Sequence, residues 1–263
     1  MIVKKTPAEI DAMAHAGEIH VRTMHLLAGK IRAGITTGEL DAAAEKFIRS
    51  QGATPAFKGY RGFPGSICAS PNHMVVHGIP GRFKLRKGDI LSVDIGVVKD
   101  GWVADGACTF PVGEVSPVAA KLLEVTETSL FRAVEQCRVG NRLGDVSHAV
   151  QSYVESNGFS VVRSLVGHGI GRSMHEEPQI PNYGPPGKGI VLEEGMVLAI
   201  EPMVNAGRHM VRMGDDGWAI YSQDGSLAAH FEHTVAVTAD GPRILTPWHE
   251  LVGNGVAPAA ASA

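Results

Sequence analysis

Apolar residues near the N-terminus recur at three- and four-residue spacing, which is typical of an amphipathic helix. Thr6-Pro7-Ala8-Glu9 forms a capping box with proline at the first helical position. The same Thr-x-x-Glu signal returns at Thr36, and Gly52 ends the helix that follows. The pattern therefore predicts helices over about residues 7–31 and 37–51.

Residues 90–98 and 102–110 are β-branched and apolar instead. Asp100-Gly101 between them is typical of a two-residue hairpin turn. Two further helices are predicted at about residues 117–138 and 144–155. Shorter apolar runs then predict strands, which we place at residues 161–166, 195–204 and 230–237.

The order helix, helix, strands therefore occurs twice along the chain. We interpret this as an α+β fold of two similar halves, about residues 1–112 and 113–252, packed about a pseudo-two-fold axis. Residues 253–263 are rich in alanine, proline and glycine, so we expect a frayed tail. A site at the seam of the two halves would draw side chains from both.

The composition is that of an ordinary globular protein, with 44% apolar and 19% charged residues among 263. A net charge of −3 gives no reason to expect stable nucleic-acid binding, although a transient contact with an RNA-rich assembly such as the ribosome is compatible with it. The three cysteines form no CxxC pair, which favours a reducing cytosol over a disulfide framework. No signal peptide or membrane-spanning run is expected, so we predict a cytoplasmic protein.

The hairpin turn determines which residues of its two strands share a face. With the turn at residues 100–101, Asp105 lies opposite Gly96, which is expected to leave open space. Asp94 is two residues from Gly96 and therefore on the same face. The two carboxylates become diagonal neighbours, roughly 7–8 Å apart at the backbone. A lone aspartate here would more simply serve the turn or a distant cation, but two on one apolar hairpin favour a shared metal ion.

Three more polar residues stand where a charged or polar group needs a partner. Glu201 and Glu232 interrupt strongly apolar strands, and His168 lies between glycines. Four carboxylates without matched lysines or arginines would repel one another and be costly to desolvate. Together with one imidazole they form a good ligand set for two divalent ions, such as Mn, Fe, Co or Zn. His77 and His175 are ambiguous alone, because a single loop histidine is more often structural or solvated than a ligand.

Several motifs together resemble type I methionine aminopeptidase, of peptidase family M24, over nearly the whole chain. They are His77-Gly78-Ile79-Pro80, the Asp94/Asp105 hairpin, Gly167-His168-Gly169-Ile170-Gly171-Arg172, His175-Glu176, Ile200-Glu201-Pro202-Met203 and Phe231-Glu232-His233-Thr234. The resemblance implies the pita-bread fold, with the active site between the two halves. It also implies removal of the initiator methionine from nascent chains when the next residue is small, by a monomer of the short bacterial form.

By the same resemblance, the two divalent ions are held by Asp94, Asp105, His168, Glu201 and Glu232, with Asp105 and Glu232 bridging. Glu201 would also carry a proton from the attacking water to the leaving nitrogen. His77 and His175 match the family's substrate-contacting histidines. The positions that match the lining of the methionine pocket are Tyr60, Phe63, Cys68 and Trp218, an aromatic and sulfur-containing set that suits a thioether.

Two pairs depart from the family pattern, namely Asn72-His73 and Asn182-Tyr183. Neither is a proposed ligand, and both bear on the pocket rim and substrate preference. One alternative is an X-Pro aminopeptidase or prolidase, which shares the ligand set but usually has a further N-terminal domain, whereas two helices precede the catalytic strands here. The other is a non-catalytic binding protein on the same fold, whose relatives typically lose the metal ligands that this chain retains.

Overall fold

The helices begin at the signals that the sequence carries. The computed structural model describes residues 2–252. Thr6 and Thr36 each cap a helix, accepting a hydrogen bond from a backbone N–H three residues on and completing a capping box. The four predicted helices are confirmed, and two of them end a few residues earlier than predicted. The helices are α1 (Pro7–Ala28), α2 (Thr37–Ser50), the 3-10 helix η1 (Tyr60–Gly62), α3 (Pro117–Glu135), α4 (Leu143–Ser156) and α5 (His249–Val252).

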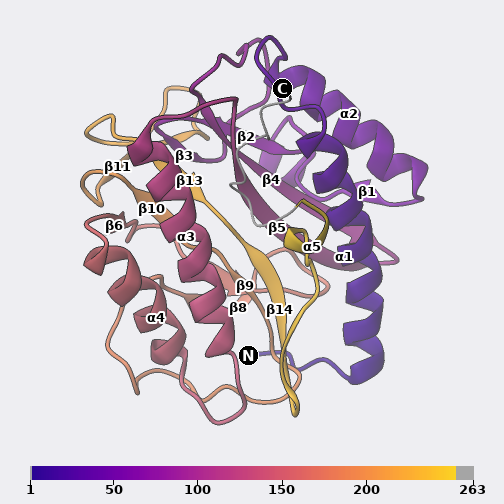
Figure 1. Cartoon of the computed structure of the whole chain (residues 1–263). Coiled ribbons are helices and arrows are strands. Elements are labelled where there is room, and N and C mark those ends of the chain that lie inside the picture. Colours follow the sequence, from indigo (N-terminus) through magenta and orange to yellow (C-terminus); the bar gives the residue numbers. More distant parts are fainter. Residues whose placement is uncertain (1, 253–263) are drawn as a thin grey trace, which may run out of the picture.

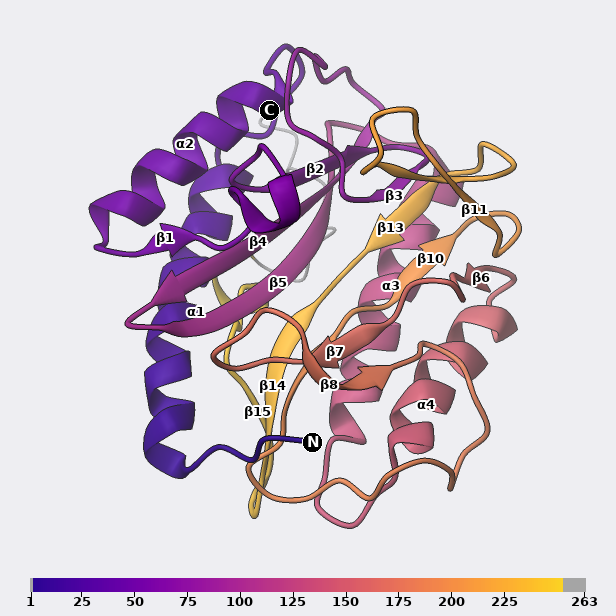
Figure 2. The same ribbon diagram turned by 180° about the vertical axis from the view of Figure 1, so that it is seen from behind.

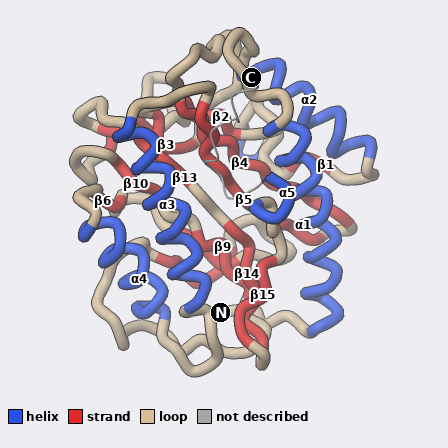
Figure 3. Tube along the Cα trace, viewed as in Figure 1, coloured by secondary structure: helices blue, strands red, loops and turns tan. Residues whose placement is uncertain are grey.

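The strands form several small sheets that lie side by side (Figure 3). Those of the first half are β1 (Thr54–Pro55), β2 (Cys68–Pro71), β3 (Met74–Val76), β4 (Ile90–Lys99) and β5 (Trp102–Pro111). Those of the second half are β6 (Ser160–Val161), β7 (Gly167–Gly169), β8 (Glu176–Ile180), β9 (Val197–Ile200), β10 (Met203–Asn205), β11 (Val211–Met213), β12 (Ile220–Ser222), β13 (Ala228–His230), β14 (His233–Thr238) and β15 (Gly241–Ile244).

The long hairpin of β4 and β5 has the predicted register. Lys99 pairs with Trp102 and Gly96 with Asp105, so Asp94 and Asp105 share a face. β1 and β2 pair with β4, and the four strands form one sheet.

The second half contains strands that are shorter than predicted. The prediction of a strand at residues 161–166 is wrong beyond Val161. The chain pairs with β10 at Ser160 and Val161 and then leaves the sheet. The run at 195–204 is divided into β9 and β10, and the run at 230–237 begins within β13 and continues as β14. β9 pairs with β14 in a five-stranded sheet, and β10 pairs with β13 in a three-stranded one.

Helices cover one side of the strands and leave the other side for the site. α1 and α3 lie in front of the strands in Figure 1 and behind them in Figure 2. α1 packs on β4 and β5, whereas α3 packs on β9, β10, β13 and β15. The boundary predicted near residue 112 falls between β5 and α3, although the division into halves at that residue remains a prediction. Within residues 2–252, no helix combines the length and apolar character needed to cross a bilayer.

Candidate metal centre and active site

A cavity of about 300 Å³ collects side chains from both halves of the chain. Residues far apart in the sequence meet there because the β4–β5 hairpin faces the strand breaks of the second half. Every site residue singled out in the sequence lines it, namely Tyr60, Phe63, Cys68, His77, Asp94, Asp105, His168, His175, Glu201, Trp218 and Glu232.

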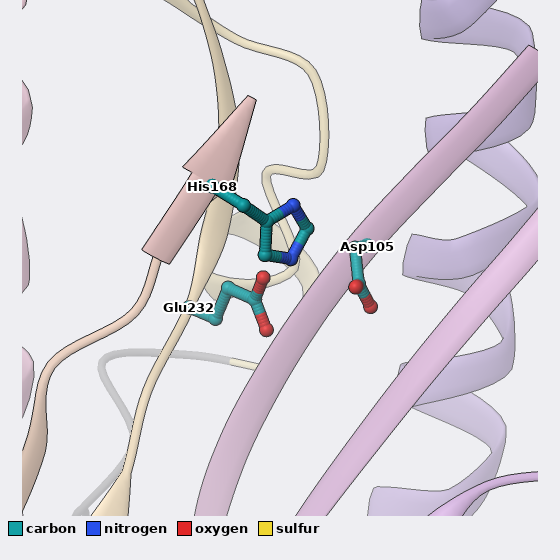
Figure 4. A group of neighbouring side chains, drawn as sticks. All are labelled: Asp105, His168 and Glu232. Carbon is teal, nitrogen blue, oxygen red and sulfur yellow. The ribbon is translucent and has the colours of Figure 1, made fainter. Parts of the chain in front are cut away.

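Three buried side chains converge at the base of this cavity. Potential ligand atoms of Asp105, His168 and Glu232 all lie within 4.8 Å of one another. Figure 4 shows their polar ends pointing toward a common space from β5, β7 and the segment before β14. The same atoms could hold a divalent cation, because imidazole nitrogen and carboxylate oxygen suit such ions.

Glu201 and Asp94 lie beside this group. Oε1 of Glu201 is 3.6 Å from Nε2 of His168. Asp94 is on the same hairpin face as Asp105. Burial, followed by the charge of Asp105, raises the pKa of Asp94. The structure thus assembles the five proposed ligands, while their binding of an ion remains a prediction.

The ring of His168 is held in the tautomer that a metal ligand needs. Its Nδ1 lies 2.9 Å from the carbonyl oxygen of Gly169. A carbonyl oxygen can only accept a hydrogen bond, so Nδ1 carries the proton and Nε2 keeps its lone pair. Burial lowers the pKa of His168 to about 4, which keeps the ring neutral.

The carboxyl groups are costly to ionise without a cation. Burial raises the pKa of Asp105 to about 7. Burial, followed by the charge of Asp105, raises the pKa values of Asp94, Glu201 and Glu232 well above their ordinary range. A divalent ion would reverse this balance by favouring the ionised forms.

Unsatisfied polar atoms at the same place also fit a metal ion. Oδ1 of Asp94 and Oε1 of Glu232 are buried and have no hydrogen-bond partner within the described chain. A buried polar group without a partner typically costs about 1–3 kcal/mol, so native proteins rarely leave such atoms unpaired. The donor set and its unmet bonding capacity therefore fit one or more divalent ions.

The strand breaks of the second half present the two glutamates. Glu201 lies between β9 and β10, and Glu232 lies between β13 and β14. Because β9 pairs with β14 and β10 pairs with β13, the two glutamates lie at facing breaks in the strand pairing. Pro202 has no N–H to continue the first strand. Glu232 exchanges backbone hydrogen bonds with Ala107 of β5 instead, at 2.9 and 3.3 Å. This exchange ties Glu232 to the hairpin that carries Asp105.

Two residues that sequence reasoning missed contact the glutamates. Nε2 of His230 is buried, lacks a hydrogen-bond partner within the described chain, and lies 3.7 Å from both Glu201 Oε2 and Glu232 Oε2. Asn182, noted only as a departure from the family pattern, donates a hydrogen bond to the backbone oxygen of Glu201 at 2.9 Å. A polar residue two positions before Glu232 in an apolar run was the available signal for His230.

The two histidines that are predicted to contact the substrate, His77 and His175, line the cavity. The rings of His175 and His168 are 4.3 Å apart between centroids. Tyr60 hydroxyl lies 2.9 Å from Nδ1 of His175, and the two rings stack. His77 has a left-handed backbone with φ 59°, a strained conformation that is found preferentially at functional sites.

Aromatic rings form the apolar part of the cavity. Phe63 and Trp218 meet edge to face, with centroids 5.1 Å apart. Cys68 pairs with Asp94 in the sheet, so the thiol lies near the carboxylates. The expectation of open space at Gly96 is wrong, because a Cβ there would lie 2.7 Å from the ring of Phe57. Gly96 therefore permits close packing of the loop against the hairpin.

A buried carboxylate and imidazole group that opens into an aromatic-lined cavity is typical of metal-dependent hydrolases. This is the class of protein that the fold and the site define. Residues 11–239 match the sequence model of metallopeptidase family M24. The chain belongs to this family.

The chain is similar to methionine aminopeptidases in both sequence and structure. It is 54% identical to the methionine aminopeptidase of Clostridium perfringens over 246 residues, which cover 94% of this chain and 99% of that protein. Methionine aminopeptidase 1 of Bacillus subtilis is also 54% identical, with the same coverage. The crystal structure of the enzyme from Rickettsia prowazekii matches with a TM-score of 0.92 at 42% identity, over 94% of this chain and 100% of that one.

These findings confirm the resemblance and the pita-bread fold of mixed helix and sheet. The prolidase alternative is weaker. The Xaa-Pro dipeptidase of Bacillus anthracis matches with a TM-score of 0.76 at 24% identity, and this chain covers 62% of its length. That likeness shows a shared fold alone.

Proposed function

We propose that this protein is a metal-dependent aminopeptidase that removes the N-terminal methionine from nascent polypeptides whose second residue is small. The observation that carries the proposal is a cavity in which buried carboxylates and His168 adjoin an aromatic, sulfur-containing wall. The high identity to proteins called methionine aminopeptidase, over nearly their whole length, supports the same activity.

Two divalent ions would be held by Asp94, Asp105, His168, Glu201 and Glu232. Two observations support this assignment: His168 is neutral with a lone pair on Nε2, and two buried carboxylate oxygens have no hydrogen-bond partner among residues 2–252. Such ions polarise a scissile carbonyl and lower the pKa of a water molecule toward neutrality. Mn, Fe, Co and Zn are all compatible with this set of ligands.

Each of the other proposed roles in the reaction belongs to a particular side chain of the site. Glu201 accepts the proton of the attacking water and passes it to the leaving nitrogen. His175 donates a hydrogen bond to the oxygen that becomes negatively charged. His77 contacts the nitrogen of the scissile peptide, and Asp94 helps to hold the free amine of the substrate.

The methionine side chain would lie against Tyr60, Phe63, Cys68 and Trp218. Thioether sulfur makes favourable contacts with aromatic rings, each worth about 0.3–1.5 kcal/mol. The edge-to-face pair of Phe63 and Trp218 supports this placement. We further propose that the protein acts as a monomer in the cytoplasm, with at most transient ribosome contact and no stable nucleic-acid or membrane partner.

A comparison of two peptides and one variant tests the proposal. Protein loaded with divalent metal should release methionine from Met-Ala-Ser and leave Ala-Pro peptides intact. His175→Ala should lower kcat by about 100-fold, since loss of one oxyanion donor costs about 10²–10³. Its metal content should stay at the wild-type level, and loss of metal would mean that His175 is itself a ligand. Preferred cleavage of Ala-Pro peptides would instead identify a prolidase-like enzyme.

A further inference from the structure

A buried lysine in the segment before α1 is ion-paired with the neighbour of His175. Nζ of Lys5 lies 2.7 Å from Oε2 of Glu176, and the two side chains are only 2% and 14% exposed. Nζ also donates to the carbonyl oxygen of Val3 at 2.9 Å. The ion pair thus joins the start of the described chain to the first residue of β8.

Glu176 uses its other oxygen to hold the loop that carries His175. Oε1 accepts a hydrogen bond from the backbone N–H of Ser173 at 3.2 Å. Residues 171–175 belong to neither a helix nor a strand, so contacts of this kind determine their path. A side chain that binds Lys5 through one oxygen and the loop through the other couples the two segments.

Two glycines allow the lysine segment to lie against this loop and against the turn before β9. A Cβ at Gly171 would lie 2.5 Å from Cε of Lys5 and 2.7 Å from Oε1 of Glu176. A Cβ at Gly195 would lie 2.5 Å from the carbonyl oxygen of Lys5, whose own N–H donates to Gly195 at 2.7 Å. Figure 2 shows the segment running from the label N to the lower end of α1.

We propose that Lys5 is a positioning residue for the reaction, which acts through Glu176 to fix the loop that carries His175. The proposal rests on the role proposed above for His175. The carboxylate of Glu176, whose side chain is only 14% exposed, is costly to keep in place without its cation and is expected to turn toward water instead. This movement weakens the hold on Ser173 and frees His175 to leave its place beside Tyr60.

The variant Lys5→Met tests this because it keeps the length of the side chain and removes its charge. We expect kcat for Met-Ala-Ser to fall by about ten-fold, a loss typical of residues that orient a functional side chain without touching the substrate. KM should change by less than about two-fold. The number of bound metal ions should not change, because the proposed ligands are untouched. Lys5→Arg should retain most of the activity. Lys4→Met is the matched control, since Lys4 forms an equally short 2.7 Å ion pair with Glu193 at a site where both side chains are 53% exposed.

Glu176→Gln removes the negative charge of the same ion pair, so we expect the same fall in kcat with unchanged metal content. This variant tests the proposal if Lys5→Met does not fold. A folded Lys5→Met or Glu176→Gln protein with wild-type kcat would overturn the proposal. So would a loss of kcat in proportion to a loss of metal.

Amide hydrogen exchange of residues 171–177 separates this proposal from the proposed activity, since it needs no substrate. Exchange there should become faster in Lys5→Met and stay unchanged in Lys4→Met. Unchanged exchange in both variants would contradict the proposal even if the wild-type enzyme releases methionine. Faster exchange in a protein whose wild type releases none would support the loop contact and refute the activity.

Discussion

The hydroxyl of Tyr60 lies 2.9 Å from Nδ1 of His175, and the two rings stack with centroids 5.5 Å apart at 25°. When Tyr60 donates this hydrogen bond, the proton of the neutral imidazole resides on Nε2, the nitrogen that can then donate to a substrate oxygen. Tyr60 is therefore a partner of His175 as well as a proposed wall of the methionine pocket.

Tyr60→Phe keeps the stacked ring and removes the hydrogen bond. We expect kcat for Met-Ala-Ser to fall by about ten-fold, because the favoured tautomer of His175 is no longer held. KM should change little, since the apolar wall remains. Steady-state kinetics check this, and a raised KM at unchanged kcat would show that Tyr60 serves the pocket alone.

Phe63→Ala should act on binding instead. The substitution removes the ring that meets Trp218 edge to face and enlarges the proposed methionine pocket. We expect KM for Met-Ala-Ser to rise by about ten-fold, which corresponds to about 1.4 kcal/mol of lost contact, with a smaller effect on kcat. Equal kinetic constants in the variant and the wild type would place the methionine side chain elsewhere.

His230 should stabilise the metal-binding form of the site. Its buried Nε2 lies 3.7 Å from a carboxylate oxygen of Glu201 and of Glu232. We expect His230→Ala to weaken metal binding by about 10–100-fold, as for other residues that orient ligands. His230→Gln, which keeps a donor, should lose less. Calorimetric titration of the metal-free protein measures both, and equal affinity in all three proteins would rule out this role.

The raised pKa of Asp105 should make its contribution to the stability of the metal-free protein fall as the pH rises from about 4 through about 7. Burial raises the pKa of Asp105 from 3.8 to about 7, so the folded state binds a proton that the unfolded chain has released. The part of the free energy of unfolding that this group contributes is therefore lost over that range. Burial lowers the pKa values of His168 and His230 to about 4 and about 3, so these groups contribute in the opposite direction. That contribution keeps growing until about one pH unit above 6.5, where histidines of the unfolded chain have lost their protons.

Urea denaturation of the metal-free wild type and of Asp105→Asn between pH 5 and 8 isolates this loss, because the histidines contribute equally to both proteins. The stability of the wild type relative to Asp105→Asn should fall over this range, because the variant lacks the raised carboxyl group. Divalent metal at 100 times its Kd should restore about 2.7 kcal/mol to the wild type through binding to the folded state. A stability difference between the two metal-free proteins that does not change with pH would contradict the pKa assignment.

Local signals predicted the parts of the fold that depend on neighbouring residues. The capping boxes at Thr6 and Thr36 placed two helices, and the turn at residues 100–101 gave the register that brings Asp94 and Asp105 to one face. These features depend on hydrogen bonds within a few residues, so the sequence alone contains them.

The strand breaks could not be predicted in the same way. Residues 230–237 were predicted as one strand, yet the chain leaves its sheet at Glu232, where backbone groups pair with Ala107 instead. This exchange depends on how the two halves pack, which no local pattern encodes. His230 was missed for the same reason, because its role depends on Glu201, which arrives from another strand.

The most direct test of the account is methionine release from Met-Ala-Ser by protein stripped with a chelator and then titrated with Mn, Fe, Co or Zn. The account predicts no release before metal is added. With at least one of the metals, the rate of methionine release should rise and level off by two ions per chain. The Asp105→Asn variant should bind fewer ions and stay largely inactive. Release by fully stripped protein, or no release with any of the four metals, would contradict it.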